Sequence, residues 1–345
     1  MKITFIRFSK NRFGGAEKYL YRLTKELKKQ DISYEIIHSN LPKWLPSWLK
    51  IILFNIQVCL SKKNKFYFSL ERVICPDIYR AGDGVHKVFV KKMNKSFLNP
   101  LHFVYIFIEK RMFKNAKKII ANSNNVKKEI IETYNIDKNK IKVIYNGIKI
   151  KEKVPFEDIK KEFNLKNEKI ILFVGSGFER KGVKEALEIV SNIEANYKFI
   201  IVGKEKNIKK YKNYAKKLKI DNRVIFTGPR DDVEKFYSLA DIFLFPTHYE
   251  PFSNVVLEAM NFENIVFTTS QNGASEIIPK EFIMKHPKDY SVISKIFTLL
   301  NNKDLLLKEQ KRAKEISKNF TIEKNVKETL KVINETSHRT SNLAW

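Results

Sequence analysis

Apolar residues recur along the chain in two alternating patterns, short continuous runs and longer stretches with helical spacing. A strand is predicted over residues 2–8, and a helix with leucines three and four positions apart over 16–29. A further strand over 34–38 completes an opening β-α-β unit. Later short apolar runs predict strands over 66–70, 118–121 and 142–145.

A second series of the same kind follows residues 149–168, a charged segment that contains Pro155 and lacks a sustained apolar period. We interpret this segment as an interdomain linker. Strict alternation of strands and helices predicts a parallel sheet with helices on both faces. The second series comprises strands over 170–174, 198–202, 224–226, 242–245 and 265–268, a loop over 175–182, and helices over 183–193, 209–218, 232–239 and about 253–261.

The two series together predict an α/β protein with two Rossmann-like, doubly wound domains that face each other across a cleft. The N-terminal domain is assigned to residues 1–150 and the C-terminal domain to residues 151–345. A polar helical region over about 304–332 is expected to pack across the back of the domains. At 345 residues the chain is long enough for two such cores.

Composition indicates an ordinary soluble globular protein, with 43% hydrophobic and 30% charged residues. No signal peptide opens the chain, and the apolar stretches 51–60 and 101–108 are too short to span a bilayer. Cys59 and Cys75 are the only cysteines, so no disulfide framework is expected and a reducing cytoplasm is favoured. We therefore expect a cytoplasmic protein, or one peripheral to the cytosolic face of a membrane.

The formal net charge of +28 is unevenly distributed. Residues 1–150 contain 31 Lys and Arg against 11 Asp and Glu, whereas the remaining residues contain 35 against 27. Lysine-rich codon usage would raise the total without a functional cause. The asymmetry indicates instead that the first half meets an anionic partner such as phosphorylated lipid, membrane headgroups or nucleic acid.

The segment from Glu250 to Glu258 (EPFSNVVLE) follows the strand over 242–245. Ligands of open α/β sheets bind beyond the carboxyl ends of strands, where this segment starts. Pro251 is expected near the first turn of a helix. The amides of Phe252, Ser253 and Asn254 would then point from the helix N-terminus toward a phosphate, and the two glutamates would accept hydrogen bonds from sugar hydroxyls.

This Glu-x7-Glu spacing after a strand resembles the signature of retaining GT-B glycosyltransferases of family 4. Further matches follow in the order of that family, and the resemblance spans about residues 1–280. They are Gly14 to Glu17, Ala121 to Ser123, Val143 to Ile148, Gly175 to Gly182, Ile201 to Gly203, Phe226 to Gly228 and Ala240 to Ile242. Within the family, Tyr79 to His86 (YRAGDGVH) is similar to the lipopolysaccharide core glucosyltransferase I branch, which adds glucose from UDP-glucose to an inner-core heptose.

The resemblance implies roles for individual residues. Glu250 would hold hydroxyls of the donor sugar, and Glu258 would hold the nucleotide ribose. Lys181, with Arg180 beside it, would neutralise the diphosphate. Lys206 is either a second cation at the same site or a solvated surface lysine. The donor-binding set is completed by Gly14, Gly15 and Gly175, of which the first two would also form a tight strand–helix turn.

Two positions depart from the family pattern: Ser253 stands where glycine is usual after Glu-Pro-Phe, and Ser176 stands where arginine often follows the strand. The second departure places more of the phosphate charge on Arg180, Lys181 and Lys206. No Asp-x-Asp triplet occurs, so we expect no metal and no other cofactor. A helix N-terminus and cationic side chains can stabilise the departing diphosphate without a divalent ion. Retention of configuration is implied only by the resemblance.

Asp83 and His86 are the candidate acceptor-side catalytic residues of the first domain. Asp83 lies between two glycines, in a turn that could expose it to the cleft. His86 could bond the acceptor or steady a leaving oxygen near neutral pH, although a histidine in a turn often serves structure alone.

Residues 87–118 combine nine Lys or Arg with one Glu and six aromatics, which suits the interface of an anionic membrane leaflet. Pro42 to Lys50, with Trp44 and Trp48 one helical turn apart, is a second candidate. The aromatics could instead pack beneath the first domain while the lysines are merely solvated. Interfacial binding would place the protein at the cytosolic face of the inner membrane, with a lipid-linked oligosaccharide as acceptor and a nucleotide sugar as donor.

Two other classes of protein fit less well. A nucleic-acid-binding protein would also be basic, but no helix-turn-helix, zinc-ligand or RNA-binding strand signature is present, so no nucleic-acid partner is expected. A dinucleotide-binding oxidoreductase would carry Gly-x-Gly-x-x-Gly after a strand, and Arg180 stands where the third glycine should be. Within the glycosyltransferases, another nucleotide sugar as donor and a capsule or glycolipid saccharide as acceptor remain open alternatives.

Overall fold

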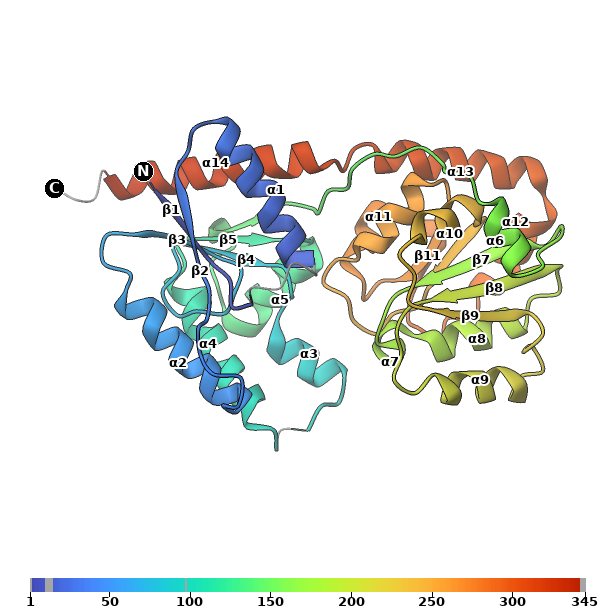
Figure 1. Cartoon of the computed structure of the whole chain (residues 1–345), viewed down its shortest axis with the longest axis horizontal. Helices are drawn as coiled ribbons and strands as arrows, with labels where there is room; N and C mark the ends of the chain where they lie inside the picture. The colour runs from blue at the N-terminus through green and yellow to red at the C-terminus, as the bar shows by residue number, and fades with distance from the viewer. Residues whose placement is uncertain (1, 10–14, 97, 342–345) are drawn as a thin grey trace. The chain divides into compact units, whose positions relative to one another are not determined.

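The computed structural model describes residues 2–9, 15–96 and 98–341 (Figure 1). The chain divides into two compact units, one formed by residues 1–146 with 322–345 and the other by residues 147–321. Each unit is built around its own six-stranded parallel sheet. Two such sheets with helices on both faces confirm the predicted α/β class with two doubly wound domains.

All strand pairs in the first unit are parallel, and its sheet has the order β2-β1-β3-β4-β5-β6. Successive residues of its strands point to opposite faces, so Ile78 packs toward α1 and α14 while Tyr79 packs toward α4 and α5. The strands are β1 (Ile3–Ile6), β2 (Tyr34–Ile37), β3 (Phe66–Ser69), β4 (Ile78–Ala81), β5 (Lys118–Ala121) and β6 (Ile141–Val143). The helices are α1 (Gly15–Lys29), α2 (Ser47–Leu60), α3 (His86–Lys92), α4 (Pro100–Asn115), α5 (Asn124–Tyr134) and α14 (Ile322–Ser341), with a 3-10 turn at Lys138–Lys140.

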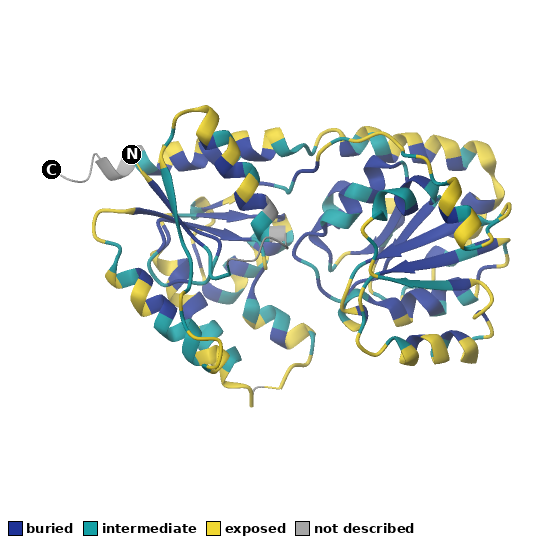
Figure 2. Ribbon diagram, viewed as in Figure 1, coloured by how far each residue is buried: buried dark blue, intermediate teal, exposed yellow. Residues whose placement is uncertain are grey.

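The second unit has the strand order β12-β11-β10-β7-β8-β9, again with parallel pairs. Helices α8 and α9 lie on one face of the sheet, and α10 and α11 on the other (Figure 1), which leaves the central strands buried (Figure 2). The strands are β7 (Lys169–Val174), β8 (Tyr197–Val202), β9 (Val224–Gly228), β10 (Ile242–Phe245), β11 (Ile265–Thr269) and β12 (Ile283–Met284). The helices are α6 (Glu157–Glu162), α7 (Phe178–Lys181), α8 (Val183–Ser191), α9 (Ile208–Lys217), α10 (Val233–Leu239), α11 (Asn254–Asn261), α12 (Val292–Asn301) and α13 (Lys303–Ser317), with 3-10 turns at Gly273–Ile277 and Lys280–Phe282.

The C-terminal helix α14 belongs to the first unit, whereas the sequence analysis assigned it to the second domain. Its apolar residues Val326, Leu330 and Ile333 are buried in the core cluster that also contains residues of α1 and the first sheet. The hydroxyls of Tyr19 and Thr329 add a buried hydrogen bond of 3.0 Å between α1 and α14. Burial of this apolar stripe is the physical reason why the chain returns to its first unit.

Two segments near the candidate site also differ from prediction. Strand β4 was not predicted because it contains Arg80, which interrupts the apolar run. In the structure this side chain is buried, donates to Asn146 Oδ1 at 2.6 Å and lies 3.8 Å from the ring centroid of Tyr19. The predicted loop over 175–182 contains the helical turn α7. Both errors arise because a local apolar pattern does not report partners that are distant in sequence.

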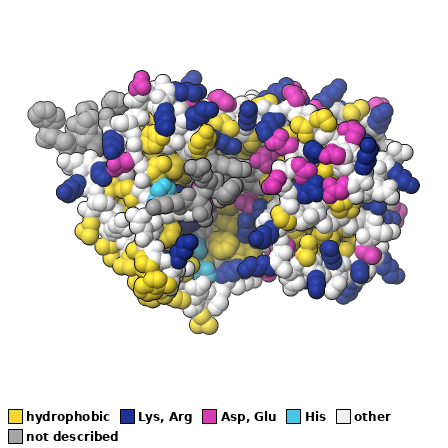
Figure 3. All heavy atoms as spheres, viewed as in Figure 1, with side chains coloured by type: hydrophobic (Ala, Val, Ile, Leu, Met, Phe, Trp, Pro, Cys, Tyr) yellow, Lys and Arg dark blue, Asp and Glu magenta, His cyan; other side chains and the backbone are white. Residues whose placement is uncertain are grey.

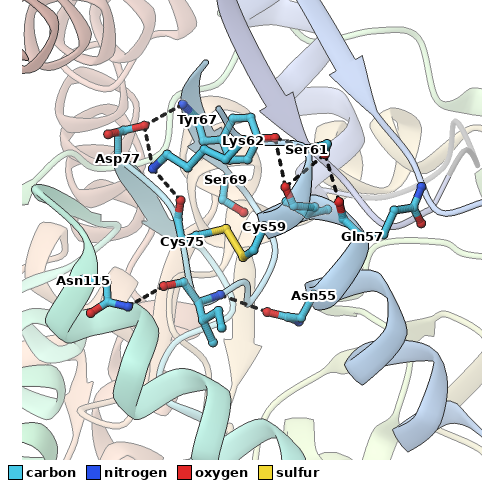
Figure 4. The surroundings of a disulfide bond; sticks show 12 residues. Asn55, Gln57, Cys59, Ser61, Lys62, Tyr67, Ser69, Cys75, Asp77 and Asn115 are labelled. Carbon is cyan, nitrogen blue, oxygen red and sulfur yellow. Dashed lines mark hydrogen bonds and ion pairs between the residues drawn. A yellow bond between two sulfur atoms is a disulfide. The ribbon is translucent and has the colours of Figure 1, made fainter. Parts of the chain in front are cut away.

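The expectation of unpaired cysteines is wrong, because Cys59 and Cys75 form a disulfide (Figure 4). It joins the last turn of α2 to the segment that precedes β4. Lys62 reinforces the same connection, since its ammonium donates to the Cys75 carbonyl at 2.8 Å and lies 3.1 Å from Asp77. Two cysteines 16 positions apart carry no sequence signal that they pair; the packing of α2 brings them together. None of the helices in the described part of the chain has the length and apolarity to cross a membrane.

Candidate active site

The charged residues that the sequence analysis placed at the diphosphate gather at one edge of the second sheet. β7 and β10 are parallel neighbours, so their carboxyl ends lie side by side. The segment after β7 contains α7 with Arg180 and Lys181, and the segment after β10 carries Glu250. This position at the carboxyl ends of adjacent strands is where open α/β sheets bind ligands.

Arg180 and Glu250 form a close ion pair. One guanidinium nitrogen of Arg180 donates to Glu250 Oε2 at 2.6 Å and to the backbone carbonyl of Tyr249 at 2.8 Å. The Glu250 side chain is 16% exposed, so a ligand can reach its carboxylate while the ion pair with Arg180 fixes its orientation. The pair joins the end of α7 to the segment that follows β10.

Lys181 is the more buried of the two cations. Its ammonium lies 3.8 Å from Glu250 Oε2 and 5.1 Å from the ring centroid of Phe245. Burial lowers the pKa of Lys181, and the positive charge of Arg180 acts in the same direction against the opposing effect of Glu250. A Cβ at Gly175 would lie 2.8 Å from Lys181 Cδ, so glycine at this position makes room for the lysine stem. Gly175 thus supports the site because it has no side chain that would compete with the stem of Lys181 for space.

The last turn of α7 is fastened to the segment after β10. The Thr247 hydroxyl and the His248 amide both donate to the carbonyl of Arg180, at 3.0 and 2.9 Å. Gly182 follows in the left-handed region with φ +76°, where a Cβ would lie 1.9 Å from the carbonyl oxygen of Pro246. The chain therefore requires glycine at 182 to hold Arg180 and Lys181 in place.

Replacing Gly182 by alanine tests this close approach, and Gly177→Ala provides a matched control. Gly177 has φ +75° but no atom within 4 Å of an added Cβ, so this variant carries only the conformational cost, about 1 to 2 kcal/mol. Gly182→Ala adds a backbone clash, for which a further loss of about 1 to 3 kcal/mol is expected. Hydrogen exchange at β7 and β10 measures both losses. Equal destabilisation by the two variants would contradict the role of the Pro246 contact.

Backbone pairing fixes Glu250. Its amide donates to the carbonyl of Gln271 at 3.1 Å, and its carbonyl accepts from the amide of Gly273 at 2.9 Å. An isolated parallel bridge between Glu250 and Asn272 connects the two segments. The carboxylate is thus held on a rigid segment beside the two cations.

Helix α11 begins close to the predicted start at about residue 253. Pro251 lies before the helix instead of in its first turn, and the first helical residue is Asn254 with Ser253 as N-cap. Phe252 and Ser253 are buried, so their side chains anchor the turn. The segment 246–253 connects the end of β10 to the start of this helix.

Glu258 lies in the second turn of α11. Its Oε2 accepts a hydrogen bond of 3.3 Å from the hydroxyl of Tyr237, a side chain in α10. Burial first, and then the adjacent Glu258 charge, raise the pKa of Tyr237 well above its usual value, so the phenol stays a donor. This hydrogen bond orients the carboxylate that was predicted to hold a ribose.

Lys206 lies at an exposed position in the loop after β8. Glu205, which sequence reasoning missed, accepts from the amide of Phe178 at 3.0 Å and so ties this loop to the start of α7. Ser176 accepts from the amide of Lys204 at 3.2 Å, a second connection between the same two loops. The structure thus places Lys206 in a loop that is fastened to the loop carrying Lys181. No local pattern marks Glu205, because its partner is 27 positions away.

Asp83 and His86 belong to the first unit. Asp83 has a side chain that is 67% exposed, with Oδ2 4.0 Å from Arg72 Nη1. His86 begins α3, and its Nε2 lies 3.0 Å from Nδ1 of His102. Burial, aided by the charges of Arg72 and His102, lowers the pKa of His86 to about 3. His86 is therefore neutral at pH 7, where it can exchange hydrogen bonds but does not supply a proton as an imidazolium.

A fully buried carboxylate organises this region, and the sequence analysis did not identify it. Glu109 accepts from Arg72 Nε at 3.0 Å, from the Tyr134 hydroxyl at 2.7 Å and from the His86 amide at 2.8 Å. Arg72 also donates to the carbonyl of Gly84 at 3.2 Å. The Arg72–Glu109 pair thus positions the turn that carries Asp83.

Gly15 is the first residue of α1, whereas Gly14 lies outside the described residues.

Family models match both units. The model described as Glycosyltransferase Family 4 matches residues 34–152, and the model described as Glycosyl transferases group 1 matches residues 155–320. Their border falls near the start of the predicted linker. The second match contains the whole Arg180–Lys181–Glu250 cluster.

Curated relatives are similar over part or nearly all of the chain. An uncharacterized glycosyltransferase of Haemophilus influenzae is 25% identical over 95% of this chain and 98% of its own length. The capsular polysaccharide biosynthesis glycosyltransferase CapM of Staphylococcus aureus is 30% identical over 59% of this chain, and the lipopolysaccharide glucosyltransferase WaaG of Escherichia coli is 27% identical over 59%. The chain spans 57% and 58% of the lengths of these last two proteins.

Solved structures share the fold over almost the whole chain. The crystal structure of WaaG, a glycosyltransferase involved in lipopolysaccharide biosynthesis, has a TM-score of 0.80 at 20% identity and covers 96% of this chain and 99% of its own. The structure of Anabaena HepE in complex with UDP-glucose has a TM-score of 0.76 at 18% identity, with coverage of 97% and 100%.

Proposed function

We propose that this chain, which belongs to the GT-B glycosyltransferases, transfers a hexose from a uridine diphosphate sugar to a lipid-linked oligosaccharide. The most specific form of the proposal is transfer of glucose from UDP-glucose to a heptose of the lipopolysaccharide inner core, with retention of configuration. The similarity to a lipopolysaccharide glucosyltransferase and to a UDP-glucose-bound neighbour supports this choice.

The observation that carries the proposal is the cluster of Arg180, Lys181 and Glu250 at the carboxyl ends of β7 and β10. Cleavage of a sugar–diphosphate bond leaves negative charge on the β-phosphate. Two adjacent cations and the N-terminus of α11 provide a positive field at this edge of the sheet. Glu250 offers a fixed carboxylate to sugar hydroxyls, and Glu258 offers one to the ribose.

We propose that this field makes a divalent metal unnecessary. Preorganised donors are worth about 3 to 4 kcal/mol each where they have been measured, so two or three could account for much of the rate. The carboxylate of Asp83 and the neutral imidazole of His86 are proposed to meet the acceptor from the first unit. Lys206 is proposed as a further cation for the diphosphate.

The acceptor is proposed to be embedded in the cytosolic leaflet of the inner membrane. Residues 87–118 would approach the anionic surface with their lysines, arginines and aromatics, of which Phe97 lies outside the described residues. Phe103 and Phe107 are more than half exposed, which suits an interface, whereas Phe113 is buried in the core. In the second candidate segment Trp44 is 80% exposed.

A capsule or glycolipid saccharide is the second candidate acceptor, favoured by the 30% identity to CapM. Purified protein should be incubated with UDP-glucose and either heptose-terminated lipopolysaccharide core or a polyprenyl-linked saccharide. Mass spectrometry of the products then identifies the acceptor. We expect one added hexose on the core and no product with the polyprenyl acceptor; the reverse result would favour capsule synthesis.

The donor and the metal requirement are tested by calorimetric titration with UDP, before and after treatment with EDTA. We expect UDP to bind with the same affinity in both conditions and transfer to continue in EDTA. NAD serves as the negative control. Binding of NAD instead of UDP, or loss of turnover on chelation, would overturn the proposal.

A further inference from the structure

An apolar groove lies on the first unit, between α2 and α4, and neither Asp83 nor His86 lines it. Its volume is about 670 Å³, within the range of cavities that bind small ligands. One wall is formed by Ile52, Ile56 and Leu60 of α2, and the other by Phe103, Val104 and Phe107 of α4. Hydrophobic side chains gather over these two helices at the lower left of the space-filling view (Figure 3).

The groove is apolar even where its lining is nominally polar. Asn55 is buried and its amide is committed to backbone: it donates to the carbonyls of Ile51 and Arg72, and it accepts from the amide of Ile74, each near 3 Å. Cys59, whose sulfur is bonded to that of Cys75, also lines the groove. A ligand of the groove therefore gains burial of apolar surface, with no hydrogen bonds from these two residues.

A disulfide and several hydrogen bonds hold the two walls of the groove in place. The Cys59–Cys75 disulfide and the Asn55 hydrogen bonds attach α2 to the segment that carries Ile74, which also lines the groove. The side chain of Asn115, at the end of α4, donates to the carbonyl of Ile74 at 2.7 Å. Both helices are thus connected to one segment, so the groove is preformed.

Helix α4, which forms one wall of the groove, carries three exposed cations. Lys110, Arg111 and Lys114 are exposed on α4, and Arg111 lies 3.7 Å from the ring centroid of the exposed Phe107. The only acidic residue of α4 is Glu109, which is fully buried and paired with Arg72. Helix α2 has no acidic residue. An occupant that combines an apolar chain with a negative headgroup complements this arrangement.

We propose that the α2–α4 groove holds one hydrocarbon chain of an anionic phospholipid while the cations of α4 contact its headgroup. The inference rests on the proposed function, in which the acceptor is membrane-bound, and makes it more specific. A lipid chain in the groove orients the first unit on the bilayer, whereas surface adsorption through Trp44 and Trp48 alone would leave the groove empty.

Photocrosslinking locates the chain directly. Full-length protein is mixed with phosphatidylcholine vesicles that contain phosphatidylglycerol with a diazirine at the end of one acyl chain. After irradiation, mass spectrometry identifies the labelled residues. We expect adducts within 52–60 and 103–108. Adducts confined to residues 42–50, or the same labelling pattern from neutral vesicles that carry the diazirine on phosphatidylcholine, would overturn the proposal.

A pair of charge-matched variants separates the groove from general electrostatics. Ile56→Asp places a carboxylate in the groove at a position that is 52% exposed, and Leu307→Asp makes the same charge change on α13 at a position that is 44% exposed. We expect Ile56→Asp to lower groove labelling about tenfold, the loss expected when an isoleucine no longer buries its side chain, and Leu307→Asp to leave it unchanged. Leu60→Asp, at a position that is 77% exposed, repeats the test if Ile56→Asp does not fold. Equal labelling of all variants would contradict the proposal.

UDP titration of the same samples keeps the two hypotheses apart. UDP binding without groove labelling would leave the glycosyltransferase proposal intact and remove the lipid site. Groove labelling without UDP binding would leave the lipid site intact and remove the glycosyltransferase proposal.

Discussion

Replacing Lys181 by alanine is expected to lower the turnover number for sugar transfer by about 100-fold to 1,000-fold, the loss typical of one preorganised electrostatic donor. The Lys181 ammonium is largely buried and lies 3.8 Å from Glu250, at the edge where the departing phosphate would develop its charge. A buried cation acts more strongly than a solvated one because water screens it less. Steady-state kinetics with UDP-glucose and acceptor measure the effect.

Lys184→Ala is the matched control for this variant. Lys184 lies three positions further along the chain, its side chain is 49% exposed, and its contact with Glu188 at 3.9 Å is a surface ion pair. The same charge is removed, yet turnover should stay within about twofold, because exposed charges contribute little. Full activity of Lys181→Ala, or an equal loss in both variants, would show that Lys181 does not contact the transition state.

The ammonium of Lys181 should also set an upper pH limit on turnover. Burial lowers the pKa of Lys181, so its protonated fraction falls as pH rises at values below the usual 10.5. If the protonated form is required, the rate should decrease with rising pH in that range, and the decrease should be absent from the residual activity of Lys181→Ala.

Replacing Glu109 by alanine is expected to lower the free energy of unfolding of the first unit by about 3 to 5 kcal/mol, because Arg72 would keep a buried charge without its carboxylate partner. The Tyr134 hydroxyl and the His86 amide would also lose an acceptor. Trp44 and Trp48 lie in the first unit and the second unit contains no tryptophan, so denaturant unfolding followed by tryptophan fluorescence reports on the first unit.

Glu132→Ala separates this effect from the general loss of a negative charge. Glu132 lies on α5 with a side chain that is 63% exposed, and it pairs with Lys128 at 3.8 Å within the same helix. Such a pair contributes about 0.3 to 0.5 kcal/mol. A comparable small loss in Glu109→Ala would mean that the buried network does not hold the turn with Asp83 and His86.

The sequence predicted the parts of the candidate site that depend on local spacing. Glu250 and Glu258 are eight positions apart in the linear motif, and Lys181 follows a strand by a fixed short distance. Because parallel strands end at a common edge, these segments could be expected to lie together before any coordinates were known. The start of α11 was predicted at about residue 253 and lies at Asn254, whereas Pro251 precedes the helix instead of lying in its first turn, since helix boundaries depend on capping contacts as well as on the apolar period.

The sequence could not predict the partners that support these residues. Glu205 holds the amide of Phe178, and Arg72 holds Glu109 across 37 positions. Neither pair produces a periodic signal, because each depends on the packing of separate elements. The disulfide was missed for the same reason.

By itself, the amino-acid sequence determined two alternating series of strands and helices, and hence two parallel sheets with charged motifs at their carboxyl ends. These features follow from periodicity and from short-range spacing, which the linear chain expresses directly. Only the tertiary structure decided that α14 returns to the first unit, that Cys59 pairs with Cys75, and that α2 and α4 enclose an apolar groove. Each of these features joins residues through the burial of surfaces on different elements, and the partner of a buried surface is set by the whole fold.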